Sequence, residues 1–200
     1  MTKTPLSSLT TNMRLGLVGT LALLGVTSGC GTTIGLTSDR FTPQFDPAPL
    51  ANYRGKAIVI HNFANADNDT SFFLYPGNGR RYGGPVLTSY FWYCFKSAFT
   101  KLGVNVLEEG QSPAGTPALD VTLVHIAEAA FKVNVTVAGV TGQPPLQKTY
   151  EVAGPPITDA QPPTLESRAY QMVSALFLAM VSDPLFQALV APQSSSPSPS

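Results

Sequence analysis

Few residues in this 200-residue chain have the types and spacing that chemistry requires. Apart from Cys30, the residues suited to binding a soft metal are His61, Cys94 and His125, and they lie far apart in the sequence. A zinc site normally contains closely spaced ligand pairs such as C-x-x-C, and the chain has none. A histidine-based hydrolase would need His61 or His125 as its general base, but a G-x-S-x-G nucleophile elbow is absent. We therefore expect no catalytic residue, no cofactor and no bound metal.

Two loop segments approach known binding motifs without matching them. In 77–83, Gly-Asn-Gly-Arg-Arg-Tyr-Gly, the third glycine is one position too late for a dinucleotide fingerprint, and Pro85 follows before any helix. Asp67-Asn-Asp69 starts like a calcium loop, but it lacks the glycine at the sixth position and the glutamate at the twelfth. We interpret both segments as ordinary loops.

The strongest local signal is the stretch that ends at Cys30. Lys3 and Arg14 precede an uncharged, mostly apolar run over 15–26, and small residues then lead into Cys30. A basic start, a short apolar run and a small-residue exit are typical of a secretory signal. As a helix, the run would reach only about 18 Å, against roughly 30 Å of bilayer hydrocarbon. This length disfavours a permanent transmembrane anchor.

Ser28-Gly29-Cys30 resembles the lipobox of bacterial lipoproteins, although Thr27 stands where that motif usually has leucine. The resemblance implies that residues 1–29 are a signal peptide, and that Cys30 carries palmitate-type lipid and becomes the mature N-terminus. Two or more acyl chains give stable membrane attachment. Gly31, rather than aspartate, follows the cysteine, which by the same resemblance favours the outer membrane, facing the periplasm. The alternative is an ordinary signal peptide that is cut nearby and leaves Cys30 as a free thiol.

The composition narrows the classes of partner. The chain has 12 basic and 12 acidic residues, and charged residues make up 12% of it, about half the usual fraction for a soluble domain. Arg80-Arg81 is the only adjacent basic pair. Because phosphate backbones are bound by clustered lysine and arginine, we expect no nucleic-acid partner.

The ends of the folded body are marked by composition. Residues 30–52 contain three prolines and no sustained periodicity, which predicts a lipidated N-terminus on a flexible tether. Residues 191–200 are a Ser/Pro tail that we expect to be disordered. Between them, 53–190 is long enough for a single domain with its own core.

Hydrophobic periodicity within the body predicts a β-α-β-β-β-α order. Strands are expected at 56–63, 104–107, 119–127, 131–138 and 146–153, with a further short strand at 71–75 and a loop at 80–85. Helices are expected at 88–102 and from 163 or 164 to 181, and Pro184 suits the first turn of a short closing helix. This order predicts an α+β fold in which two helices pack on one face of a mixed or antiparallel sheet of about four to five strands.

The aromatic cluster at 90–93 offers a candidate partner surface. Phe91 and Cys94 belong to the apolar side of the predicted helix, where a lone cysteine is usually a small buried residue. Trp92 and Tyr93 lie outside the apolar side of the predicted helix. They form either an exposed partner surface or a second layer of core.

The order of elements resembles small periplasm-facing lipoproteins of the YajG and LptE kind, and the related accessory lipoproteins of ABC transport systems. The features that carry the likeness are the strand at 53–63, the helix ending in Lys101-Leu-Gly-Val104, the long hairpin, and the closing Ser182-Asp-Pro-Leu185. The resemblance implies a non-enzymatic assembly or transport-accessory role, with an envelope protein or lipid as partner. A lipid- or glycan-binding lipoprotein is the alternative, and a hydrolase a further one.

Overall fold

The protein is described by a computed structural model that covers residues 33–66, 74–75, 80–83, 87–126, 130–156 and 161–192. Its main sheet has the strand order β6-β2-β7-β8-β9. These strands are β6 (Asn105–Leu107), β2 (Ala57–Ile60), β7 (Ala118–Ile126), β8 (Ala130–Ala138) and β9 (Leu146–Ala153), and β3 (Ala64–Asn65) adds to β7. β2 is parallel to β6 and β7, whereas β7, β8 and β9 are antiparallel neighbours. The mixed α+β fold predicted from the sequence is confirmed.

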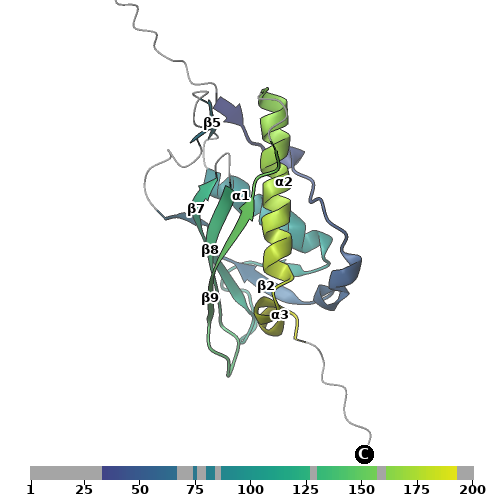
Figure 1. Cartoon of the computed structure of the whole chain (residues 1–200). Helices are drawn as coiled ribbons and strands as arrows, with labels where there is room; N and C mark the ends of the chain where they lie inside the picture. Colours follow the sequence, from purple (N-terminus) through teal and green to yellow (C-terminus); the bar gives the residue numbers. More distant parts are fainter. Residues whose placement is uncertain are drawn as a thin grey trace, which may run out of the picture.

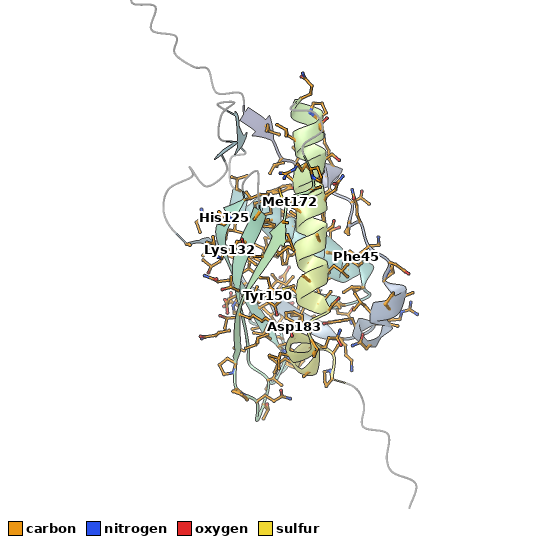
Figure 2. The ribbon with its side chains drawn as sticks, viewed as in Figure 1. Phe45, His125, Lys132, Tyr150, Met172 and Asp183 are labelled. Atoms are coloured by element: carbon orange, nitrogen blue, oxygen red, sulfur yellow. The ribbon has the colours of Figure 1, made fainter. Side chains whose placement is uncertain are left out.

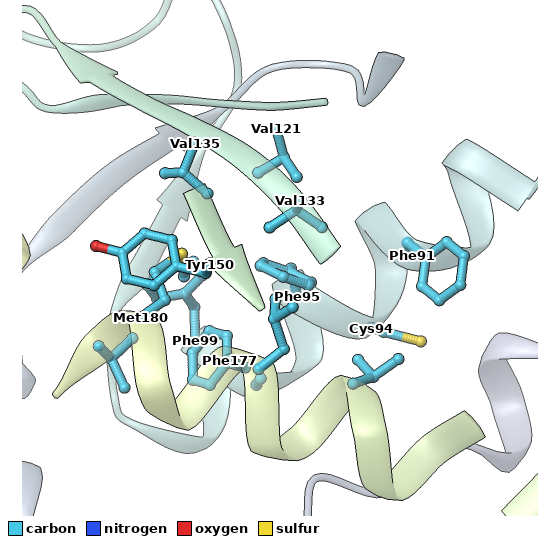
Figure 3. Packing of buried hydrophobic residues seen from close by; sticks show 14 of the residues in the cluster. Phe91, Cys94, Phe95, Phe99, Val121, Val133, Val135, Tyr150, Phe177 and Met180 are labelled. Atoms are coloured by element: carbon cyan, nitrogen blue, oxygen red, sulfur yellow. The ribbon is translucent and has the colours of Figure 1, made fainter. Parts of the chain in front are cut away.

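Two long helices cover one face of this sheet (Figure 1). They are α1 (Leu87–Lys101) and α2 (Pro162–Val181), and α2 is followed directly by the short α3 (Pro184–Val190). The apolar side chains that recur at helical spacing along the two long helices are buried; they include Phe91, Cys94, Phe95, Ala98, Phe99, Leu102, Leu165, Ala169, Met172, Val173, Leu176, Phe177 and Met180. Figure 3 shows the aromatic rings of α1 and α2 packed beneath the valines of the sheet.

The two faces of the sheet differ as the alternation in β8 predicts. Phe131, Val133, Val135 and Val137 are buried under the helices. The residues between them face the other side, where Lys132 pairs with Glu151 of β9 at 3.2 Å. A register shift between Leu123 and His125 marks a bulge in β7, and such bulges locally increase strand twist.

The segment 33–53 is not the flexible tether that the sequence suggested. It forms β1 (Thr33–Gly35) and two short 3-10 helices, η1 (Ser38–Arg40) and η2 (Ala48–Tyr53). Five of its apolar side chains are buried: Ile34, Leu36, Phe41, Leu50 and Tyr53. The Phe45 ring stacks on Phe177 of α2 at 5.5 Å between centroids, and Lys101 of α1 donates to the Pro43 carbonyl at 2.7 Å. The segment therefore packs across α1 and α2 as a strap.

The reason for this difference is the spacing of the apolar residues in the strap. Periodicity detects helices and strands because their side chains repeat every 3.6 or 2 residues. A strap that is neither regular helix nor long strand buries its apolar residues wherever a neighbouring element offers a groove. Its prolines fix φ near −65° and suit such an extended path.

A second, small sheet has the order β1-β5-β4. β5 (Arg80–Gly83) is parallel to β1 and antiparallel to β4 (Leu74–Tyr75). The prediction of a loop over 80–85 is therefore wrong for 80–83, because pairing with a strand some fifty positions earlier leaves no local signal. Of the predicted strand at 71–75, residues 74–75 are found in β4; the rest lies outside the described residues, as do Asp67-Asn-Asp69 and the turn at 76–79.

Within the described part of the chain, no single helix has the length and apolar character needed to cross a bilayer. Pro163–Val181 and Pro184–Val190 satisfy the length and composition criteria only as a pair, and they are bent by 74° at the break between them.

Candidate functional site

The residues around β1 form the end of the domain nearest in sequence to Cys30, which itself lies outside the described residues. The Tyr170 hydroxyl of α2 donates its proton to Glu166 at 2.6 Å and also lies 3.2 Å from the Thr37 carbonyl oxygen. The guanidinium of Arg40 lies 3.4 Å from both carboxylate oxygens of Glu166. Burial, together with the bond to Glu166, raises the pKa of Tyr170 to about 12, so the phenol remains a hydrogen-bond donor at neutral pH. These contacts hold the strap to the first turns of α2.

The predicted partner surface at Trp92 and Tyr93 is divided between core and solvent. The Trp92 indole N–H donates to the Ile60 carbonyl at 3.1 Å, and its ring is half-buried against the core. Tyr93 is 53% exposed, and its ring meets that of Trp92 edge to face at 4.9 Å. Lys96 Nζ lies over the Trp92 ring, 5.0 Å from its centroid.

A pocket of about 330 Å³ opens beside these two aromatic residues. It is lined by Asn62, Phe63, Thr88, Ser89, Trp92 and Tyr93. The combination of aromatic faces with amide and hydroxyl groups is the kind of lining that holds a small ligand by stacking and orients it by hydrogen bonds. Its volume is at the lower end of the range found for small-molecule sites.

His61 lies outside β2, although the sequence predicts a strand over 56–63. It follows the last residue of β2, and its Nδ1 lies 2.8 Å from Asp120 Oδ1 of β7. Both side chains are partly open to solvent, at 31% and 51% exposure. A carboxylate in this position fixes the orientation of the imidazole. Among the described hydroxyl and thiol groups, none is hydrogen-bonded to His61.

The remaining candidate ligands do not come together. No group of three or more His, Cys, Asp and Glu side chains in the described residues could hold a metal ion. Cys94 is fully buried in the core, and burial raises the pKa of its thiol to about 12. Such a thiol is neither a ready nucleophile nor a ready metal ligand.

Asp183, at the junction of α2 and α3, accepts three hydrogen bonds through its side chain. Its Oδ2 accepts from Lys148 at 2.6 Å and from Tyr150 at 2.7 Å, and its Oδ1 accepts from the backbone N–H of Leu185 at 2.9 Å. Figure 2 shows Tyr150 and Asp183 side by side at this end of α2. Burial alone would raise the pKa of Asp183, but these hydrogen bonds outweigh it and hold the pKa below its ordinary value.

Local sequence patterns reveal only part of this network. Asp183 directly before Pro184 is a helix N-cap signal, which accounts for the bond to Leu185. Lys148 and Tyr150 are separated from Asp183 by 35 and 33 positions, so no local pattern reveals them. Nor does the sequence reveal the partnership of His61 with Asp120, 59 positions away.

Comparison with known proteins finds a similar fold but assigns no function. No family model matches the sequence, and no curated protein matches it. Among solved structures, protein XCC0632 from Xanthomonas campestris, assigned to the DUF330 family, is similar at 15% identity and a TM-score of 0.55, covering 75% of this chain and 92% of that one. An uncharacterised protein is similar at 12% identity and a TM-score of 0.48, covering 64% of this chain and 92% of its own. The likeness to XCC0632 shows a shared fold alone.

Proposed function

We propose that this protein is a lipid-anchored lipoprotein of the bacterial cell envelope and acts as a non-enzymatic interaction module in assembly or transport. The observation that carries the proposal is the position of Cys30. It ends a signal-type sequence with a small-residue exit, and the first strand of the folded body begins at Thr33. A signal, a lipidation-type cysteine and a body with its own core form the arrangement expected of a domain held at a membrane.

The fold is compatible with this role. Mixed α+β domains of this kind host many functions, so a shared fold cannot by itself establish one. The resemblance to small envelope lipoproteins in the order of elements favours an accessory role, with the outer membrane, facing the periplasm, as the proposed location. The partly exposed Trp92 and Tyr93 are the proposed partner surface, since exposed aromatic side chains are enriched where proteins bind partners.

The anchor is tested by labelled palmitate. Wild-type protein expressed in a bacterial host should incorporate the label and fractionate with membranes, and Cys30→Ala should do neither. Cys94→Ala is the matched control, because it removes a buried cysteine and should leave labelling unchanged. A wild-type protein that is unlabelled and found in the soluble fraction would refute the proposal.

The partner surface is tested by site-specific crosslinking in the native envelope. A photo-crosslinking residue at Tyr93 should give one defined adduct, whereas the same residue at Glu151, on the open face of the sheet, should not. Equal, diffuse crosslinking from both positions would contradict a specific partner at Tyr93.

A second candidate, a lipid- or glycan-binding lipoprotein, is favoured by the pocket beside Trp92. Trp92 is the only tryptophan of the chain, so its fluorescence reports on this pocket directly. Titration with envelope glycans or phospholipids should change that fluorescence in a saturable way, and Thr88→Val should weaken the effect. Unchanged fluorescence, together with native mass spectra free of any bound small molecule, would dismiss this candidate.

A further inference from the structure

A lipid on Cys30 would hold the β1 end of the domain very close to the membrane. Only Gly31 and Thr32 separate Cys30 from Thr33. A chain spans at most about 3.6 Å per residue, so the Cα atoms of Cys30 and Thr33 are no more than about 11 Å apart in any conformation. The headgroup layer of one leaflet is itself roughly 5 to 8 Å thick. The first strand of the body therefore begins at, or just above, the headgroups.

The strand cannot act as a further length of tether, because it is held to the body. β1 pairs with β5 over three register positions, and the Ile34 side chain that it carries is 1% exposed. Immediately after β1, Thr37 and Arg40 are bonded to Tyr170 and Glu166 of α2. Residues 33–52, which the sequence predicts to be part of the tether, are instead part of the folded domain.

The length of α2 separates this end from the opposite one. Glu166, near the start of α2, contacts the strap beside β1, whereas α3 begins three residues after Val181. At 1.5 Å per residue, the helix between Glu166 and Val181 is about 23 Å long. Figure 1 shows β1 and β5 beside the N-terminal end of α2 and α3 at its C-terminal end.

Basic residues are placed at the β1 end by the strand register. Arg81 is the register partner of Thr33, and Arg80 precedes it in β5. The Arg40 side chain is 67% exposed. Asp39 and Glu166 are acidic residues at the same end, and Glu166 is paired with Arg40. Near an anionic membrane surface each basic residue contributes about 1 kcal/mol, or roughly a fivefold gain in binding.

We propose that the β1 end of the domain binds the phospholipid headgroup surface, with Arg40, Arg80 and Arg81 supplying attraction to anionic lipids, and that α3 is held away from the bilayer. This orientation rests on the proposed function, because it requires the lipid on Cys30. In this arrangement the domain lies on the membrane in a single orientation, rather than moving freely on a flexible tether. It also leaves the α3 end, where the Leu185 side chain is 60% exposed, facing the aqueous side.

The test uses the lipidated, mature protein reconstituted in vesicles of phosphatidylethanolamine and phosphatidylglycerol. A fluorophore is attached at Asp39→Cys or at Leu185→Cys, both exposed positions, while the fully buried Cys94 takes no label. Lipids with a spin-labelled headgroup then quench whatever lies near the surface. Quenching should be severalfold stronger at position 39 than at position 185. Equal quenching at the two positions would overturn the orientation.

The arginines are tested with the same label at position 39. Replacing both Arg80 and Arg81 with serine should lower the ratio of docked to undocked domain roughly 25-fold, the product of two fivefold effects. Arg54→Ser is the matched control, since Arg54 is exposed at the opposite end, where Gly55 bonds to Gly103 and Lys56 to Pro192. High salt should have the same effect on the wild type, which keeps the test decisive if the double variant folds poorly. Quenching that neither change lowers would overturn the role of the arginines.

Failure of the lipid anchor and failure of the orientation give different results in these experiments. If the protein does not incorporate lipid and washes off the vesicles, the proposed function fails. If it is lipidated and stays bound while both labels are equally remote from the headgroups, only the orientation fails.

Discussion

The two ends of α2 carry the same combination of groups in different surroundings. At the N-terminal end, Glu166 is bonded to Tyr170 and paired with Arg40. At the C-terminal end, Asp183 is bonded to Tyr150 and paired with Lys148. Each set is a carboxylate, a tyrosine and a basic residue, and each joins α2 or its end to a distant part of the chain.

The difference lies in distance and exposure. The Lys148–Asp183 pair is 2.6 Å apart, with the lysine 45% and the carboxylate side chain 6% exposed. The Arg40–Glu166 pair is 3.4 Å apart, with the arginine 67% and the carboxylate side chain 15% exposed. Charged hydrogen bonds contribute more where water is excluded, while exposed ion pairs contribute little. The comparison indicates that the end far from Cys30 is fixed firmly, and that the end near Cys30 keeps a charged group available for another surface.

The largest expected effect comes from deleting the two carboxylates. Asp183→Ala removes the acceptor of the buried Tyr150 hydroxyl and of the half-exposed Lys148 ammonium, together with the N-cap of α3. It should lower the free energy of unfolding by about 3 kcal/mol. Glu166→Ala should lower it by about 1 kcal/mol. Urea unfolding of the Cys30→Ala protein, followed by Trp92 fluorescence, measures both. Equal losses would contradict the comparison.

A smaller effect is expected from acid. Because the pKa of Asp183 is lowered on folding, its ionised form stabilises the folded state. That stabilisation is fully present above the pKa of an unfolded aspartate, about 4, and is lost as the pH falls through the lower value of the folded state. As the pH falls from about 5 through the ordinary aspartate pKa of about 4 and below it, wild type should therefore lose more stability than Asp183→Asn, which has no carboxyl to titrate. Parallel pH profiles of unfolding free energy in the two proteins would refute this role.

Tyr150 and Tyr170, at the two ends of α2, are expected to contribute differently to stability. Tyr150→Phe removes a buried hydrogen bond to the Asp183 carboxylate and should cost about 1.5 kcal/mol. Tyr170→Phe should cost only about 0.5 kcal/mol, because the Glu166 carboxylate that it releases can be reached by water and by Arg40. Thermal unfolding of the two single variants gives the ranking, and a larger shift for Tyr170→Phe would reverse it.

The smallest effect is expected at Arg40. An exposed ion pair at 3.4 Å contributes at most about 0.5 kcal/mol, so Arg40→Ala should leave the stability of the soluble domain nearly unchanged. The same change should weaken contact with anionic vesicles, which separates a surface role from a structural one. A large loss of stability without any change at the membrane would contradict the proposed orientation.

Much of the fold follows from periodicity in the sequence. The stripe from Phe91 to Leu102 and the alternation in β8 are regular over several turns or pleats, and both are found where they were predicted. The strap and β5 were not foreseen, because Phe45 and Arg81 are positioned by partners far along the chain rather than by local repeats.

The contacts of the candidate site are harder to predict from the sequence, because they too depend on partners far along the chain. Tyr93 was identified as a candidate because it lies off the apolar face of a helix, and it is exposed. The acceptor role of Asp183 and the partnership of His61 with Asp120 depend on three-dimensional register, which a single sequence does not encode in any local motif.

The most direct test of the account is the chemical state of the mature N-terminus. Mass spectrometry of the protein purified from bacterial membranes should show a chain that begins at Cys30 and carries diacylglyceryl on its sulfur. A chain that begins at another residue, with an unmodified Cys30 or without it, would contradict both the anchor and the orientation built on it.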